Sequence, residues 1–453
     1  MIINHKILKA LFLVLIQVAF VTDVFAQTEA ETIIVKVGNK TITKTEFINR
    51  AEFTPRPDYC RLDNYIHRKI VLNTLIAEKM MAIEAGESNE LTNSPEYKAY
   101  LIGRKEQAMR QIHFYENAYI KSKPDSSTVA QIYDIAGRTY NVSYFRINDL
   151  NTSRQAYSDL VNLKISFDSV YTALSSSDTI PTKQISYFNN ELPEIHKALF
   201  AEELNKGEIL EPIFVDDSNI IIRIDGWTDR LAVSDKDKLI RWNDLYKKLT
   251  EDKAIIVYEE YVSELMSGKR IEFNRPTFEK LVEITAPYYL KSNKDKKRLL
   301  KSSLWKPNSE EEVLIDNLYD VDDIRNLELL KIDDEIWTVE KFIEELKIHP
   351  LVFRKQDLRK KNFAEQMKLA IADLIRDKYI TQDAYEKGID KHPLVQRNVA
   401  LWRDNLLALY QKYMVLSSVG EEKLNKKKVL NDIMNPYVRE LQLKHSDIIK
   451  INI

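Results

Sequence analysis

The sequence predicts a mostly helical α+β protein, in which a helical module carries a small inserted domain and is followed by a second, C-terminal copy of its hairpin-plus-helix unit. Three observations support this fold class. Apolar residues recur at helical spacing over several long segments. A short hairpin pattern followed at once by a helix occurs near the start of the chain and again late in it. Between the two copies lies a segment that begins and ends with a β-branched strand.

The first 26 residues have the pattern of a cleavable signal peptide. Lys6 and Lys9 give a positive start, an apolar run covers Ala10–Val21, and the small residue Ala26 ends the segment. We expect cleavage after Ala26 and export to the periplasm. The apolar run is shorter than the roughly 20 residues that span a bilayer, although an uncleaved anchor remains the alternative.

Composition narrows the function classes. Cys60 is the only cysteine, so neither an intramolecular disulfide nor a thiolate metal site can form. The net charge of −2 gives no electrostatic support to a nucleic-acid partner, and only 9 glycines occur in 453 residues, none at the spacing of a phosphate loop. We therefore expect no cofactor, no metal and no nucleic acid.

The first copy of the repeated unit begins with a hairpin over residues 32–42, with Gly38-Asn39 as its turn. Thr43 and Glu46 have the spacing of a capping box, which predicts a helix start in which each side chain satisfies a backbone N–H. A longer helix is expected from Asn64 to Ala85. Another helix follows Ser94-Pro95, because proline fits the first turn of a helix.

The same order recurs in the second half of the chain. Phe342 takes the place of Phe47, and the other matching segments are Lys331–Thr338 with Lys36–Thr43, Leu374–Lys378 with Leu75–Lys79, and His392-Pro393 with Ser94-Pro95. The shared order of hairpin and helix favours a duplication over a chance likeness of two amphipathic segments. We expect the terminal strand, Ile448–Ile453, to pair with one of the two hairpins.

The middle segment of the chain shows strand patterns as well as helix patterns. Strands are predicted at Tyr140–Ile147 and Ile220–Ile224, with three helices between them, and the first and last strands are able to lie side by side. The helices are expected at Ser153–Leu163, at Phe167–Leu174, and from Leu192-Pro193-Glu194 through Phe200. One long helix then covers Ser234–Ser267.

These residues carry a resemblance to a known family. The run Leu192–Phe200, then Gly207-Glu208-Ile209, Glu211-Pro212-Ile213 and Ile221–Ile224, resembles a parvulin-type peptidyl-prolyl isomerase domain. Together with the helical segment before it, the chain looks like the SurA, PrsA and PpiD class of chaperones. The resemblance implies a helical chaperone module at 27–135, a parvulin-like domain at 136–229, a helical connection at 230–328 and a second chaperone-like repeat at 329–453.

The chain departs from the family pattern at each catalytic position. Tyr144 and Ile220 stand where the family has histidines, and Ile195 replaces the phenylalanine that seats proline. His196 follows Ile195, and we expect it to be an exposed helical residue because neighbouring helical positions do not share a face. We assign no catalytic residue.

Even without catalytic residues, the resemblance implies a cleft that binds peptides. Tyr144, Tyr187 and Ile195 are its candidate lining residues, with buried core as the alternative interpretation for the tyrosines. For Phe188 and Phe200 we expect ordinary core positions.

The leading hypothesis is a periplasmic chaperone that binds unfolded client polypeptides, outer-membrane proteins among them, through apolar clefts. Met80 and Met81 are candidates for an adaptable surface, although their helical spacing favours core. A transient contact with the membrane or with outer-membrane assembly machinery would fit this role. One alternative is an active peptidyl-prolyl isomerase, and another is a structural subunit of an envelope complex.

Overall fold

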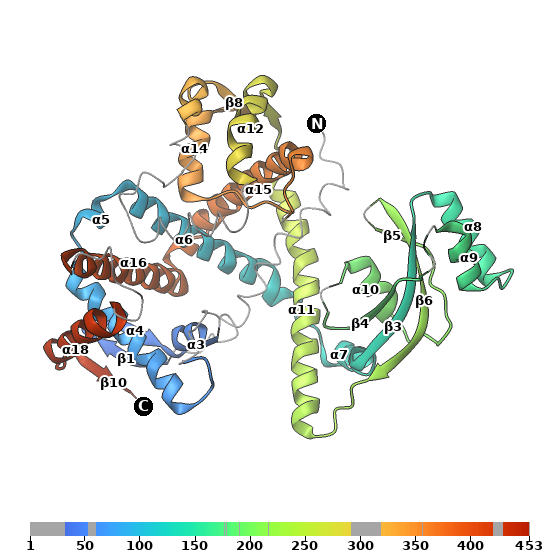
Figure 1. Cartoon of the computed structure of the whole chain (residues 1–453), viewed down its shortest axis with the longest axis horizontal. Helices are drawn as coiled ribbons and strands as arrows, with labels where there is room; N and C mark the ends of the chain where they lie inside the picture. The colour runs from blue at the N-terminus through green and yellow to red at the C-terminus, as the bar shows by residue number, and fades with distance from the viewer. Residues whose placement is uncertain are drawn as a thin grey trace. The chain divides into compact units, whose positions relative to one another are not determined.

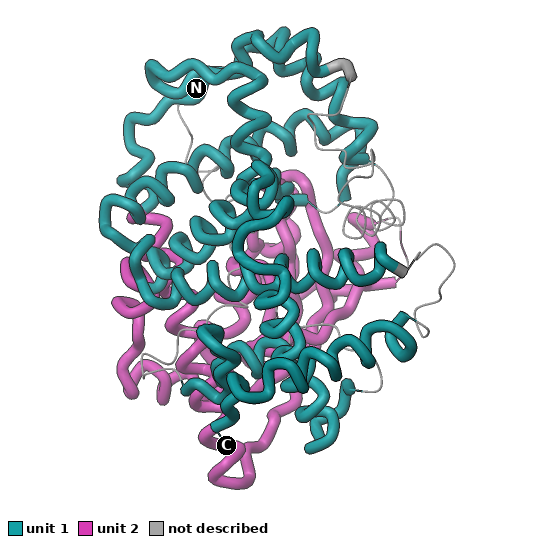
Figure 2. The backbone as a smooth tube through the Cα atoms, turned by 90° about the vertical axis from the view of Figure 1, so that its left-hand side faces the viewer, with its two compact units in different colours: residues 1–115, 262–453 teal, residues 116–261 magenta. Residues whose placement is uncertain are grey.

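The computed structural model describes residues 32–52, 60–290, 319–419 and 429–452, apart from the single positions 176, 178, 190, 216 and 356. The predicted signal peptide lies outside the described residues. The chain forms two compact units, shown in Figure 2: unit 1 contains residues 1–115 and 262–453, and unit 2 contains residues 116–261. Unit 2 is thus inserted into unit 1. The finer division of the mature chain into four segments stays a prediction.

The first repeat of unit 1 follows the predicted order of hairpin and helices. Its elements are β1 (Ile33–Val37), β2 (Lys40–Thr43), α3 (Lys44–Glu52), α4 (Tyr65–Ala85), α5 (Glu90–Asn93) and α6 (Pro95–Phe114). Gly38 turns the hairpin with a φ of 59°, which glycine adopts without strain. The side chain of Asn64 caps α4, and that of Ser94 caps α6.

Only half of the predicted capping box forms. The backbone N–H of Glu46 donates to Thr43 Oγ1 at 3.1 Å, which caps the start of α3. The carboxylate of Glu46 does not reach back to the cap. It lies 3.0 Å from the amine of Lys79 on α4, because a buried cation there offers a stronger partner than a backbone N–H.

The second repeat contains the same elements. It is preceded by β7 (Ile271–Phe273) and α12 (Arg275–Tyr289), and comprises η7 (Tyr319–Ile324), β8 (Glu328–Ile332), β9 (Glu335–Thr338), α14 (Val339–Ile348), α15 (Lys360–Glu386), η8 (Ile389–Lys391), α16 (Pro393–Val419), η10 (Val429–Met434), α18 (Asn435–Lys444) and β10 (Ile449–Ile451). Asp333 turns the second hairpin with a φ of 51°. This arrangement confirms the predicted second copy.

Each hairpin of unit 1 becomes a three-stranded antiparallel sheet. The strand orders are β10-β1-β2 and β7-β8-β9. Ile451 pairs with Val35 in the first sheet, and Phe273 pairs with Leu330 in the second. The predicted pairing of the terminal strand with a hairpin is confirmed.

Unit 2 is built on a four-stranded antiparallel sheet with the order β4-β3-β6-β5. Its elements are η3 (Tyr115–Tyr119), η4 (Ile120–Ser122), α7 (Ser126–Tyr133), η5 (Ile135–Gly137), β3 (Arg138–Ile147), α8 (Leu150–Val161), α9 (Phe167–Leu174), β4 (Thr182–Ser186), α10 (Pro193–Phe200), β5 (Ile213–Val215), β6 (Ser218–Asp229) and α11 (Asp235–Leu265), where η3 and α11 extend across the unit boundaries. β3 and β6 pair over their whole length, as expected for the first and last strands.

Alternate residues of the two central strands bury opposite faces of this sheet. Phe145 and Ile221 face α8 and α9, whereas Tyr140, Val142 and Ile222 belong to the core shared with α7, α10 and α11. Figure 1 shows α8 and α9 on one side of the sheet and α10 on the other. The two faces therefore present separate candidate sites.

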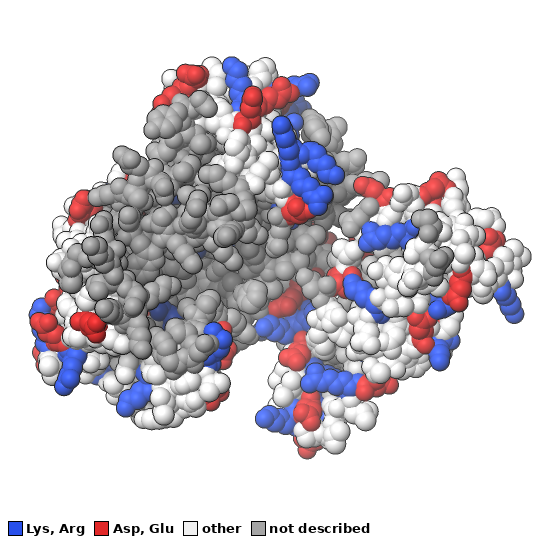
Figure 3. All heavy atoms as spheres, in the orientation of Figure 1, with Lys and Arg blue, Asp and Glu red and all other residues white. Residues whose placement is uncertain are grey.

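The structure confirms the mostly helical α+β class. Among the described residues, none of the helices combines the length and the apolar character that crossing a bilayer requires. On the face of unit 2 that Figure 3 shows, basic and acidic side chains are interspersed with uncharged ones.

Candidate functional site

The side of the unit 2 sheet that faces α10 carries a cluster of aromatic rings. Phe200 on α10 lies 5.4 Å from the ring of Tyr140 and 5.2 Å from that of Tyr187, measured between ring centroids. Trp227 on β6 lies 6.2 Å from Tyr140. The Phe200–Tyr187 contact is edge-to-face and the Phe200–Tyr140 contact is tilted. Aromatic pairs of this kind stabilise beyond the area they bury, so the two contacts of Phe200 help to hold α10 on the sheet.

The structure brings the three predicted peptide-site residues into this one core. Tyr187 is 3% exposed and Ile195 is 7% exposed, while Tyr144 is half-buried and packs against the same cluster. Burial raises the pKa of Tyr187 to about 12. A peptide would reach Tyr187 and Ile195 only after the covering side chains moved, and their role in peptide binding stays a prediction.

Phe188 and Phe200 differ from each other in exposure. Phe200 is 4% exposed, which confirms its core position. Phe188 is 43% exposed, so the expectation of a core position was wrong for this residue. It lies two residues after the end of β4 and presents an aromatic ring at the surface, 5.4 Å from the Tyr187 ring.

His196 is not the exposed residue that its helical position suggested. Its Nε2 donates to the carbonyl oxygen of Tyr187 at 2.8 Å, and its ring lies 4.7 Å from the Tyr187 ring. Burial lowers the pKa of His196, so the imidazole is neutral at pH 7, with its proton on Nε2 because a carbonyl only accepts. The turn before α10 brings Tyr187 over this helix face, a contact that residue spacing within the helix does not reveal.

The positions where the family carries its catalytic histidines hold no imidazole. Tyr144 stands on β3, and Ile220 on β6 is 2% exposed within the core. His196 is the only histidine in the sequence of unit 2, and it is bound to a backbone carbonyl. Unit 2 thus has one histidine, where the resemblance led us to expect two.

Helix α11 covers the same face of the sheet. Leu245 is fully buried in the cluster that contains Tyr187 and Ile195, and Trp242, Tyr246 and Leu249 pack against that cluster. These side chains lie within about two turns of one helix, so they form a continuous apolar cover. Helix α11 therefore covers the aromatic cluster on this face of the sheet.

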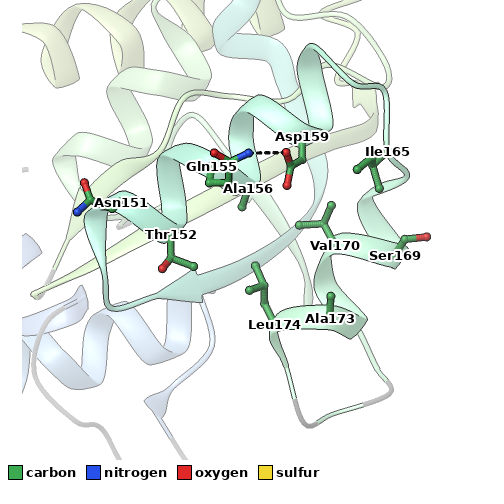
Figure 4. Close-up of a pocket in the computed structure, with 10 residues that line it drawn as sticks. All are labelled: Asn151, Thr152, Gln155, Ala156, Asp159, Ile165, Ser169, Val170, Ala173 and Leu174. Atoms are coloured by element: carbon green, nitrogen blue, oxygen red, sulfur yellow. Dashed lines mark hydrogen bonds between the residues drawn. The ribbon is translucent and has the colours of Figure 1, made fainter.

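The helices α8 and α9, which cover the opposite face of the sheet, have a surface hollow of about 510 Å³ between them (Figure 4). Thr152, Gln155 and Asp159 line it from α8, and the Gln155 amide donates to Asp159 at 2.8 Å. Ile165 precedes α9 and Leu174 ends it, and they are 41% and 46% exposed. The hollow combines an aliphatic wall with a polar one.

Sequence reasoning missed this hollow. Val170 on α9 matches the buried stripe that periodicity predicts, but Leu174, one turn later, remains exposed in the structure. The one sequence signal for a site here was Ile165, an aliphatic residue in the short polar connection between α8 and α9. Single exposed aliphatic residues are common, so this signal alone does not identify a site.

Unit 1 exposes a short apolar segment at the start of α4. Leu62, Tyr65 and Ile66 are 65%, 77% and 67% exposed and lie within five consecutive positions. The proposed methionines behave differently, because Met80 is fully buried in the core of the first repeat and Met81 packs against that core. Within the described residues, no group of three or more histidine, cysteine or carboxylate side chains is placed to hold a metal ion.

Comparison with known proteins identifies no family for this chain. No family model matches it, and neither does any curated protein. Among solved structures it is similar to the peptidylprolyl isomerase PrsA from Bacillus anthracis (15% identity, covering 42% of this chain and 96% of that chain, TM-score 0.22). It is also similar to the foldase protein PrsA from Streptococcus pneumoniae (13% identity, 52% and 94%, TM-score 0.23) and to PrsA from Bacillus subtilis (15%, 52% and 93%, TM-score 0.18). These values are too low to transfer an activity, so we base the function on the residues.

Proposed function

We propose that the protein is an exported, periplasmic folding chaperone that holds unfolded client polypeptides, outer-membrane proteins among them, without prolyl isomerase chemistry. The proposed absence of isomerase chemistry rests on the aromatic face of unit 2, the side of the sheet that faces α10. Its histidine positions are occupied by Tyr144 and Ile220, and the apolar side chains of α11 fill the space over Tyr187 and Ile195. Catalysis of amide rotation requires a site that favours the twisted amide over both planar forms, and the cover that α11 lays over this face argues against an open one.

Client holding is supported by the exposed apolar segment of unit 1. Leu62, Tyr65 and Ile66 present large apolar side chains to solvent, an arrangement that attracts the apolar segments of unfolded chains. Tyrosine suits such a surface, because its ring buries apolar area while its hydroxyl stays hydrated. The hollow between α8 and α9, with Ile165 and Leu174 exposed, would be a secondary contact.

Two measurements on the purified protein test the proposal. It should suppress aggregation of an unfolded outer-membrane protein on dilution from denaturant. It should leave the relaxation of an Xaa-Pro peptide at its uncatalysed time of roughly tens to hundreds of seconds at 25 °C. Acceleration of that relaxation, lost in a His196→Ala variant, would favour the isomerase instead. Capture of one stoichiometric partner and no unfolded chains would favour a structural subunit.

A surface variant distinguishes specific client binding at the start of α4 from nonspecific binding to exposed apolar residues. Replacing Leu62, Tyr65 and Ile66 by serine should weaken client binding about tenfold or more, because each of these side chains buries apolar area against a client. The matched control replaces Leu231 and Val233, which are 79% and 81% exposed in unit 2, by serine and should leave client binding unchanged. Equal losses in both variants would contradict a specific role for the start of α4.

Export is tested separately from client binding. Mass spectrometry of the protein recovered from the periplasm should show a mature chain that begins at Gln27. A chain that keeps residues 1–26 and sediments with membranes would support the uncleaved anchor.

A further inference from the structure

The two repeats of unit 1 exchange the long helices α6 and α16. Helix α16 of the second repeat packs along α4 of the first, and α6 of the first repeat packs on α14 and α15 of the second. Gly103 on α6 lies so close to α14 that a Cβ atom there would be 2.2 Å from the carbonyl oxygen of Ile348. Met109 and Ile112 of α6 share a buried cluster with Ala384 of α15.

The repeats also exchange their last strands. β10, at the end of the second repeat, completes the sheet of the first, and β7, which follows the first repeat and its inserted unit, completes the sheet of the second. Leu441 of α18 is buried in the core of the first repeat, and Phe273 of β7 packs against the core of the second. Each repeat therefore lacks a helix and a strand that the other supplies.

A buried cluster of charges lies where α16 meets the first repeat. Asp404 is 4% exposed, and its carboxylate lies 2.5 Å from the amine of Lys40 and 3.1 Å from that of Lys79. Lys79 also contacts Glu46 at 3.0 Å. Although burial acts to lower it, Glu46 and Asp404 hold the pKa of Lys79 above its ordinary value, so the amine remains charged.

The charges of this cluster balance only when α16 is in place. The first repeat contributes three cations (Lys40, Arg50, Lys79) and two carboxylates (Glu46, Glu78), of which Arg50 and Glu78 pair at 2.8 Å. Asp404 supplies the missing negative charge, and it is the only acidic residue in α16. An apolar segment in place of α16 would leave Lys40 and Lys79 with Glu46 as their only carboxylate partner in this cluster, and so one buried positive charge unbalanced, which is strongly unfavourable.

The other exchanged helix carries a carboxylate at the corresponding position. The carboxylate of Glu106 on α6 lies 2.6 Å from Nε2 of His349, the residue that follows α14. It also accepts a hydrogen bond of 3.1 Å from the hydroxyl of Tyr385 on α15. About two turns further along α6, His113 contacts Asp383 of α15 at 2.5 Å. Both exchanged helices thus meet polar partners of the other repeat, and on α6 Arg110 adds contacts with Thr381 and Asp377 of α15.

We propose that Asp404 and Glu106 are specificity determinants that direct α16 and α6 to the opposite repeat and disfavour other apolar segments in their places. Buried charges contribute little net stability compared with well-packed apolar groups, but they penalise every occupant that lacks the matching charge. The inference concerns recognition within the chain and does not depend on client binding.

Hydrogen exchange on the full-length protein tests the proposal. In Asp404→Leu, the amides of β1, α4 and α16 should exchange at least roughly 100-fold faster, because unpaired lysines expel the helix, while β8, β9 and α12 remain protected. In Glu106→Gln, the loss of hydrogen-exchange protection should appear instead in the amides of α6, α14 and α15. The control Glu96→Gln removes an exposed carboxylate from α6 and should change neither set.

A second variant keeps the test decisive if Asp404→Leu fails to fold. Lys40→Met, Glu46→Gln, Lys79→Met and Asp404→Leu together remove both sides of the charge match, and should restore protection of α4 and α16 to within about tenfold of the wild type. If α4 and α16 stay unprotected in this fourfold variant, the charged residues act through packing and not through their charge. If α4 and α16 keep normal protection in Asp404→Leu, the charges do not select the helix. Either result overturns the proposal.

Discussion

Gly103 shows how one missing side chain sets the distance between two helices. It lies in the middle of α6, where alanine is favoured over glycine by about 1 kcal/mol in helix propensity. A Cβ atom at this position would nevertheless meet the backbone oxygen of Ile348 at 2.2 Å. Because backbone cannot rotate aside as a side chain does, the close crossing of α6 and α14 depends on glycine.

We therefore predict that Gly103→Ala destabilises unit 1 by about 1–3 kcal/mol, in the range of overpacked cores, despite its better helix propensity. Urea unfolding followed by circular dichroism measures the change. Lys98→Ala, at an exposed position of the same helix, is the matched control and should stay within about 0.5 kcal/mol of the wild type. A more stable Gly103→Ala protein would show that the two helices do not meet this closely.

Glu106 gives the contact between α6 and the second repeat a pH dependence. Burial acts to raise its pKa, but hydrogen bonds from His349 and Tyr385 outweigh burial and hold it below the ordinary value of 4.5. A carboxyl with a lowered pKa stabilises the folded state above its unfolded value and loses that contribution as pH falls through the folded one. The stability difference between wild type and Glu106→Gln should therefore be largest near pH 7 and shrink below pH 4.5. A constant difference between pH 7 and pH 3 would contradict this.

At the scale of elements, the terminal strand β10 closes the edge of β1. The backbone of Gly38 donates to Ile448 at 3.1 Å and that of Asn452 donates to Ile34 at 2.9 Å, so both ends of the strand are tied down. We predict that a chain ending at Ser446 exchanges the amides of β1 at least roughly tenfold faster, because that edge becomes open to solvent. The paired strands β3 and β6 of unit 2 provide the internal control and should be unchanged.

Local sequence signals were sufficient for most elements. Proline and serine or asparagine caps marked the starts of α4, α6 and α16, and β-branched runs marked β1, β3 and β6. β4 was not predicted, because its Thr182, Lys183 and Gln184 are exposed on an edge strand and show no apolar alternation. The partner of Glu46 was mispredicted for a related reason, since Lys79 is distant in sequence and only the fold brings it near.

At the scale of the whole molecule, the exchange between repeats and the covering of the aromatic face escaped sequence reasoning. A duplicated pattern shows that two units exist, but both a side-by-side and an exchanged arrangement bury the same apolar residues. The choice between them depends on contacts such as Asp404 with Lys79, which join positions far apart in the chain. Likewise, the apolar stripe of α11 predicted a helix without indicating that it would fill the face bearing Tyr187.

Exchange has a consequence for how unit 1 unfolds. If each repeat contributes a helix and a strand to the other, neither can open alone, and damage to one core should lower protection in both. Leu75 and Ile371 are fully buried in the cores of the first and second repeats. Replacing either by alanine should cost about 2–5 kcal/mol through the lost contacts and the cavity.

Hydrogen exchange should therefore report one cooperative unit across both repeats. In Leu75→Ala and in Ile371→Ala alike, the amides of α4 and α15 should lose protection by similar factors, because opening either repeat removes an element from the other. Leu199→Ala is the control: it leaves a comparable cavity in the core of unit 2, and its largest losses should be confined to β3, β6 and α10. If Leu75→Ala affected α4 while α15 kept its protection, the repeats would be independent domains, and the exchanged helix and strand would contribute little to their cohesion.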